Sequence, residues 1–130
     1  MGFVARASVA SLSRTLVRNV APLPGDNFAV AVGADDGSFR GGARSTVAGR
    51  LELDRLHVDG SALIGVGWVR STGSMKRSLV RRSNVAAYLS DGAAPNIEAD
   101  NRFVENQDNR IAFGQALELP GAINLPAPNR

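Results

Sequence analysis

The stretch from residue 50 to residue 70, RLELDRLHVDGSALIGVGWVR, constrains the fold more than any other part of the chain. It holds Asp59-Gly60 between two apolar runs, and these two residue types tolerate the positive φ that a type I′ turn needs. The pattern therefore predicts a central β-hairpin over about residues 50–70, with an Asp-Gly turn. Such a hairpin would nucleate an antiparallel sheet.

The first strand of this hairpin does not keep a strict alternation. Leu51 and Leu53 stand at odd positions, whereas Leu56 and Val58 stand at even ones, and a change of phase moves side chains to the other face. One extra residue would restore the pattern, so a β-bulge is predicted near Asp54-Arg55. The predicted cross-strand pairs are Val58 with Ser61, Leu56 with Leu63, Leu53 with Gly65 and Leu51 with Gly67.

The second strand is apolar on both faces, which suits a strand covered by a second layer. The predicted register also places Trp68 opposite Arg50, where a cation–π contact would form. This face needs a cover. The arms at the two ends of the chain, its own or borrowed from a neighbour, are the candidates.

Length and composition indicate one β-rich domain. The 130 residues suffice for a hydrophobic core, and 14 glycines and 6 prolines suit a loop-rich β protein. We therefore predict an all-β antiparallel sandwich or barrel over residues 23–118. Without cysteine the chain has no disulfide or thiolate metal site, and no apolar run is long enough to span a membrane.

Both ends of the chain are predicted to form arms. In residues 1–22, four apolar residues between Val9 and Val20 recur at helical spacing, which favours an N-terminal arm or a short amphipathic helix. Residues 119–130 carry too many prolines for a helix, so an extended C-terminal arm is expected. Its apolar side chains are the predicted assembly residues: Leu119, Ile123 and Leu125.

Smaller patterns complete the prediction of the fold. Short strands are expected at Phe28–Val32 and Asn84–Ser90, with a short helical turn as the alternative for Asn84–Ser90, and a loop is expected at Ser71–Ser74. Two similar pieces, residues 100–104 and 108–113, each resemble a turn that leads into a short strand. Two such short spans do not predict a solenoid.

Basic residues gather between positions 70 and 82, where five fall within thirteen positions and no acid occurs. They are Arg70, Lys76, Arg77, Arg81 and Arg82. Three interpretations stay open: contact with the phosphates of a nucleic acid, charges that protect a strand edge, or docking to an acidic segment of a neighbouring subunit. The chain is also dipolar, because residues 91–130 hold six acidic residues against three arginines, and these charges could pair within the chain or with a neighbouring subunit.

No motif for catalysis or cofactor binding is found. His57 is the single histidine, and no nucleophile elbow accompanies it. Glu52 and Asp54 are spaced to share a strand face, but the predicted bulge would separate them. Phosphate-binding and dinucleotide-binding loops have no match either. We therefore predict a protein that is not an enzyme and has no cofactor and no metal.

Three functions are compatible with these patterns. The first is a structural subunit of a large symmetric assembly, for which a virion protein (capsid coat, or decoration and cement protein) is the expected type, assembled in the host cytoplasm. Its partners would be copies of itself and another shell protein. The alternative is a small cytoplasmic nucleic-acid-binding β-domain that uses residues 70–82. The third is an enzyme or ligand-binding domain whose site the sequence does not reveal.

Overall fold

The computed structural model describes residues 2–6, 8–22, 24–25, 29–36 and 49–114. The elements that it assigns there are strands, and all the strand pairings are parallel. The strands are β1 (Phe3–Arg6), β2 (Val9–Ser13), β3 (Leu16–Val20), β4 (Val30–Asp35), β5 (Arg50–Asp54), β6 (His57–Val69), β7 (Thr72–Lys76), β8 (Leu79–Ser90), β9 (Asn96–Ile97), β10 (Arg102–Val104) and β11 (Asp108–Gly114).

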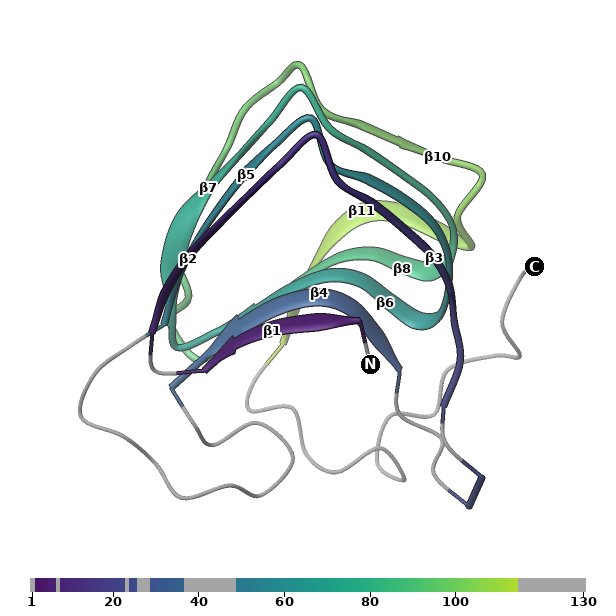
Figure 1. The fold of residues 1–130 in the computed structure, drawn as a ribbon, viewed down its shortest axis with the longest axis horizontal. Coiled ribbons are helices and arrows are strands. Elements are labelled where there is room, and N and C mark those ends of the chain that lie inside the picture. The colour runs from purple at the N-terminus through teal and green to yellow at the C-terminus, as the bar shows by residue number, and fades with distance from the viewer. Residues whose placement is uncertain (1, 7, 23, 26–28, 37–48, 115–130) are drawn as a thin grey trace.

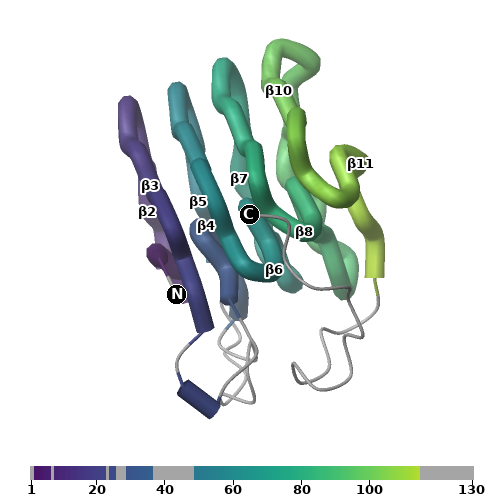
Figure 2. Tube along the Cα trace, turned by 90° about the vertical axis from the view of Figure 1, so that its right-hand side faces the viewer, coloured from purple at the N-terminus to yellow at the C-terminus, as the bar shows by residue number. Residues whose placement is uncertain are grey.

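The strands wind into a three-sided parallel β-solenoid (Figure 1). Side one consists of β2, β5, β7 and β9. Side two consists of β3, the first halves of β6 and β8, and β10. Side three consists of β1, β4, the second halves of β6 and β8, and β11. Figure 2 shows the successive turns lying side by side along the axis.

Hydrogen bonds between adjacent turns show how many residues one turn contains. The N–H of Leu56 donates to the hydroxyl of Ser78, at a sequence separation of 22. The N–H of Ser78 donates in turn to the side chain of Asn101, at a separation of 23. The strand register has the same period, since Arg50 pairs with Thr72 and Leu79 pairs with Arg102. Each turn therefore repeats the same three sides, and equivalent residues form rows that run parallel to the axis.

The three corners are made by residues with positive φ. Most of these residues are not glycine, and side chains rarely adopt this conformation. At the first corner they are Arg14, Arg55 and Arg77, with φ of 51°, 55° and 49°; at the second they are Asn19, Gly60, Arg82 and Glu105, with φ of 51°, 93°, 54° and 56°; at the third they are Arg70 and Asp91, with φ of 46° and 53°. Stacking of equivalent corners holds each of them in a conformation that an isolated chain disfavours.

The antiparallel sandwich or barrel predicted from the sequence is wrong, and so is its central hairpin. Asp59-Gly60 lies inside β6, where the positive φ of Gly60 bends the strand from side two to side three without reversing it. Val58 consequently pairs with Val80, and Ser61 pairs with Ser83. The four predicted cross-strand pairs do not form.

The predicted bulge near Asp54-Arg55 is also wrong. Arg55 is instead a corner between β5 and β6 with a φ of 55°. The change of hydrophobic phase that suggested a bulge arises because the chain passes from one side of the solenoid to the next. On each side the apolar positions still point inward: Leu51 and Leu53 on β5, and Val58 on β6, are buried.

The N-terminal residues form part of the solenoid and not a helical arm. Residues 3–20 hold β1, β2 and β3, which pair with β4, β5 and β6. The helical spacing between Val9 and Val20 arises because two short strands with a corner between them place apolar residues three or four positions apart. Residues 100–104 and 108–113 also belong to the solenoid, which these two short spans did not predict. The prediction that each leads into a short strand is confirmed, by β10 and β11.

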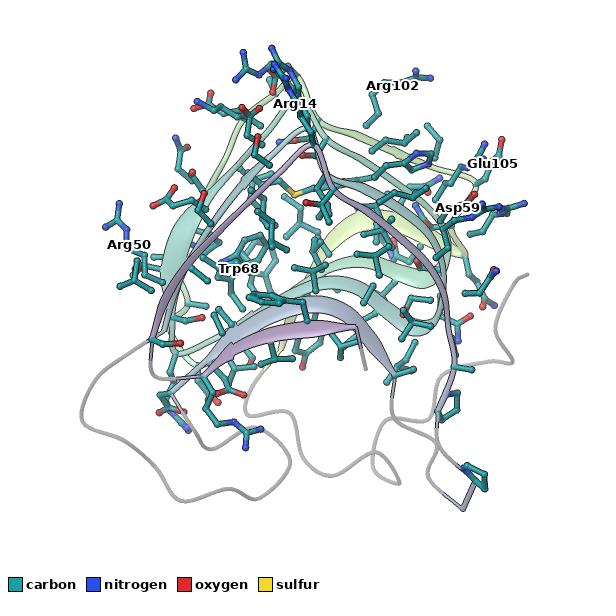
Figure 3. All side chains as sticks on the ribbon, in the orientation of Figure 1. Arg14, Arg50, Asp59, Trp68, Arg102 and Glu105 are labelled. Carbon is teal, nitrogen blue, oxygen red and sulfur yellow. The ribbon has the colours of Figure 1, made fainter. Side chains whose placement is uncertain are left out.

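The core lies between the three sides. Trp68 is fully buried and points into this interior, whereas Arg50 lies outside side one (Figure 3). The predicted cation–π pair is therefore wrong, and Trp68 stacks in register with Ala34 and Leu89 instead. The strand at Asn84–Ser90 is confirmed as part of β8, and the strand expected at Phe28–Val32 appears as β4, shifted to later residues.

Side three is buried on both faces at its centre, as the apolar sequence of its strands predicted. All six residues of β4 are buried, and so are residues 58–69 of β6. The C-terminal arm, one of the two proposed covers, lies outside the described residues.

Candidate functional site

The five residues of the basic cluster do not form one patch. Lys76 and Arg77 lie at the first corner, Arg81 and Arg82 at the second, and Arg70 at the third. A cluster that is compact in sequence is therefore divided among three corners of the solenoid. The sequence could not show this division, because it depends on where each turn bends.

At the second corner two of these arginines converge on Asp59. The Arg82 Nε donates to Asp59 Oδ1 over 2.6 Å, and the Arg81 Nη2 donates to Asp59 Oδ2 over 3.1 Å. The Asp59 side chain is only 5% exposed. Burial alone would raise the pKa of this carboxyl, but the hydrogen bonds from the two arginines outweigh it, and the pKa lies below its ordinary value. Figure 3 shows Asp59 and Glu105 near the same corner.

The other two corners carry ion pairs of the same kind. Arg77 binds Asp54 with two hydrogen bonds, of 2.8 and 2.6 Å, and its backbone N–H donates to Asp100. The hydrogen bond from Arg77 lowers the pKa of Asp54 and raises that of Arg77 itself. Arg70 lies in register between two acidic residues: its Nη1 is 3.8 Å from Asp36 and its Nη2 is 3.2 Å from Asp91.

These contacts show that most residues of the basic cluster form ion pairs within the chain. Four of its five members pair with carboxylates of neighbouring turns, and for the exposed Lys76 no ion pair is found with a carboxylate of the described residues. Paired arginines have less charge available for phosphates, which weighs against the nucleic-acid alternative without testing it. The corner ion pairs form ladders along the axis, and these ion-pair ladders join one turn to the next.

The outer face of side one carries a shallow polar cavity of about 270 Å³, lined by residues of β2, β5 and β7. Glu52 and Asp54 both face outward from β5 here, so the sequence argument that separated them was wrong. The hydroxyl of Ser74 donates to Glu52, and this bond is the main reason why the pKa of Glu52 is lowered. Both carboxyls are therefore held ionised, which suits a hydrogen-bond acceptor better than a general acid.

His57 does not lie among catalytic partners in the described part of the chain. It stands in a row on side two between Leu16 and Leu79. The described residues contain no group of three or more histidine or acidic side chains that could hold a metal ion. Among the same residues, no helix is long and apolar enough to cross a membrane.

The ends of the solenoid are the sites that sequence reasoning missed. Among the described residues, three large apolar side chains are exposed, Val9 and Phe113 at 77% and Leu16 at 54%, and all three lie on strands of the end turns. At the N-terminal end a hollow of about 550 Å³ is lined by side chains of the first turn, among them Phe3 and Val17. Only the three-dimensional arrangement identifies these residues as terminal, because their sequence context is like that of the core.

The chain was compared with family models, curated proteins and solved structures, and none of the three comparisons gave a match.

Acid is expected to weaken the fold through the corner ion pairs. The pKa of Asp54, Asp59 and Asp108 is lower in the folded chain than the ordinary value of 3.8. A lowered folded pKa adds stability above the unfolded pKa, and this stability is lost as the pH falls through the folded pKa. The free energy of unfolding, measured with urea, should therefore be constant near pH 7 and fall most steeply below about pH 4.

Asp59→Asn tests the contribution of the second corner. This variant should lose about 1–2 kcal/mol at pH 7, because it removes charged hydrogen bonds whose arginine ends are partly exposed. Its further loss between pH 7 and pH 3 should be smaller than that of the unmodified protein. Asp108→Asn is the matched control, since the ion-pair partner of Asp108 in the described part of the chain is Arg110, which is 86% exposed. Equal effects of the two substitutions would contradict the role given to Asp59.

Proposed function

We propose that this chain is a structural subunit of a large assembly and that it joins its neighbours through the N-terminal end of the solenoid. The observation that carries this proposal is the hollow, open first turn. Its strands β1, β2 and β3 each pair on one edge only within the described residues. Open strand edges next to exposed apolar side chains are surfaces on which another chain can add strands.

The proposed partner is a second copy of the chain. The described first turn carries Arg14 and Arg18, together with Arg6, whose Nε is 3.5 Å from Asp35, and residues 1–22 hold no acid. The last turn carries Glu98, Asp100 and Glu105 against Arg102 at the opposite end of the axis. Opposite charges at the two ends favour contact between unlike ends. Such a heterologous contact repeats into a ring or a filament.

The virion setting remains part of this proposal. Capsid and decoration proteins act through contacts between subunits, and a rigid solenoid whose turns are joined by ion-pair ladders suits that task. The fold itself does not choose among structural settings. The partner surface described above applies equally to another shell protein that presents an acidic end.

Val9→Glu combined with Leu16→Glu tests the proposed surface. The two substitutions should weaken self-association at least about tenfold, because they place charges where apolar side chains would become buried. Light scattering coupled to size exclusion, over a range of protein concentrations, measures this change. Negative-stain imaging would show whether the larger species is a ring or a filament.

Thr72→Glu is the matched control for Val9→Glu. Thr72 is exposed and lies in the same row as Val9, two turns along the axis. The control should associate as the unmodified protein does. The proposal fails if the unmodified protein is a monomer at all concentrations, or if Thr72→Glu weakens association as much as Val9→Glu does.

A further inference from the structure

Two interior rows run along the axis and end at the last described turn. They are the row of Leu12, Leu53, Met75 and Ile97 on side one, and the row of Val17, Val58, Val80 and Phe103 on side two. The middle members are at most 1% exposed. Ile97 and Phe103 are only partly buried, because no further turn of the described residues covers them. The C-terminal end therefore presents an unfinished apolar core.

The sequence beyond Gly114 continues both rows at the spacing of one turn. Leu119 follows Ile97, and Leu125 follows Phe103, by the same interval that separates Leu56 from Ser78. This interval also separates the paired residues Leu53, Met75 and Ile97. Residues 115–130 lie outside the described residues, so this match compares their sequence with the register observed in the described turns.

The residues around these leucines fit the same register. Leu117 stands one such interval after Pro95, in the row of the buried Leu51 and Gly73, so it would also face inward. Glu118 stands one interval after Asn96, in the outward row of Ser74. Apolar and polar residues thus alternate as a strand with one buried face requires.

The first corner has a counterpart as well. Arg55 and Arg77 have a positive φ there, Ala99 of the fourth turn does not, and Gly121 stands one interval after Ala99 and two after Arg77. Glycine adopts a positive φ without the steric penalty that other residues incur. Ile123 follows Asn101 by the same interval, and Asn101 is in one row with Ser78 and the buried Leu56.

We propose that residues 115–130 bind to the C-terminal end of their own solenoid and complete a fifth turn. They would add one strand to side one and one to side two, with Leu119 and Leu125 covering Ile97 and Phe103. The occupant of this end is therefore the chain's own C-terminal segment.

The arrangement of the strands provides room for this segment. Side three holds five strands, from β1 to β11, whereas sides one and two hold four each in the described residues. The chain leaves β11 on side three, and the next sides along its path are one and two. In the third turn these two sides and their corners take residues 70–84. The segment 115–130 is only one residue longer than that stretch.

A designed disulfide tests the register. In parallel neighbouring strands the Cα atoms of paired residues lie about 5 Å apart, within the range that a disulfide bridges. The pair Asn96→Cys and Glu118→Cys should therefore form an intramolecular disulfide in most molecules on mild oxidation. The chain has no cysteine of its own to compete. Mass spectrometry of the intact protein and a non-reducing gel measure the product.

The pair Asn96→Cys and Leu117→Cys is the matched control. Leu117 is one residue earlier and would face the interior, so this pair should close at least about tenfold more slowly. Equal rates for the two pairs, no disulfide in either, or a disulfide-linked dimer in place of the closed monomer would each overturn the proposal.

A second measurement does not depend on cysteine chemistry. Leu119→Asp with Leu125→Asp should lower the midpoint of urea unfolding clearly, whereas Asn124→Asp, in an outward row, should leave it unchanged. Equal midpoints for the two variants would also overturn the proposal. Both tests can be made in the Val9→Glu, Leu16→Glu background, where the chain is expected to be monomeric. A failure of the fifth-turn proposal can thus be distinguished from a failure of the proposed assembly.

Discussion

Replacing Trp68 by alanine is expected to lower the free energy of unfolding by about 3–5 kcal/mol, the usual loss for a large aromatic side chain in a close-packed core. Trp68 is fully buried and lies in the middle of its row, between Ala34 and Leu89. The neighbouring turns are fixed by their own hydrogen bonds, so they cannot collapse into the space that the indole leaves. Urea or guanidinium unfolding, followed by far-UV circular dichroism, measures the loss.

Phe113→Ala is the matched control for this prediction. Phe113 pairs with Leu89 and thus belongs to the same row as Trp68, but it is 77% exposed on the last described strand. Its truncation should change the free energy of unfolding by less than about 1 kcal/mol. Comparable losses for the two variants would mean that the position of a side chain in the stack of turns does not determine how much it stabilises the fold.

The hairpin prediction failed for a specific physical reason. The sequence correctly indicated that the backbone near Asp59-Gly60 needs a positive φ, and Gly60 has a φ of 93°. A positive φ permits both a reversal and a bend, however, and the two-residue signature does not distinguish them. The choice of a bend depends on the parallel strands on either side, β3 and β8, which are far from β6 in the sequence.

The solenoid itself left a signal in the sequence that short-range pattern reading does not detect. Leu53, Met75 and Ile97 recur once in every turn, but their chemical similarity is only that they are apolar. The corner residues recur as well, as Arg55 and Arg77. A search for self-similarity at the periods typical of solenoids would have found this repeat. The two spans at 100–104 and 108–113 lie much closer together than one turn, and their spacing is unrelated to it.

The candidate sites were predictable only in part. Arginine and acidic residues were recognised as candidates for mutual pairing, and the structure places such pairs within one chain, between adjacent turns. The exposed ends could not be predicted, since Phe113 shares a row with the buried Trp68 and Leu89 and is exposed where no later turn of the described residues covers it. Burial depends on the number of turns on each side, which a local pattern does not contain.

Gly73→Ala is expected to destabilise the protein by about 3 kcal/mol, because a side chain here is opposed both by the backbone conformation and by a neighbouring strand. The sequence predicted a loop at Ser71–Ser74, but Gly73 lies within β7 and pairs with Leu51 of β5. Its φ is +144°, and a Cβ built on it would lie 1.9 Å from the carbonyl oxygen of Leu51. That oxygen belongs to the backbone of a buried strand and cannot move aside as a flexible side chain could.

Gly92→Ala separates the two contributions. Gly92 also has a positive φ, of +75°, but a Cβ there would meet no atom within 4 Å. This variant should therefore lose only about 1 kcal/mol, the cost of placing an alanine in a left-handed conformation. The difference of about 2 kcal/mol between the two variants, measured by urea unfolding, is the contribution of the close approach of β5 and β7. If Gly73→Ala were no more destabilising than Gly92→Ala, side one could not have the strand spacing and register described for it. The rows from which the fifth turn is inferred would then have to be reassigned.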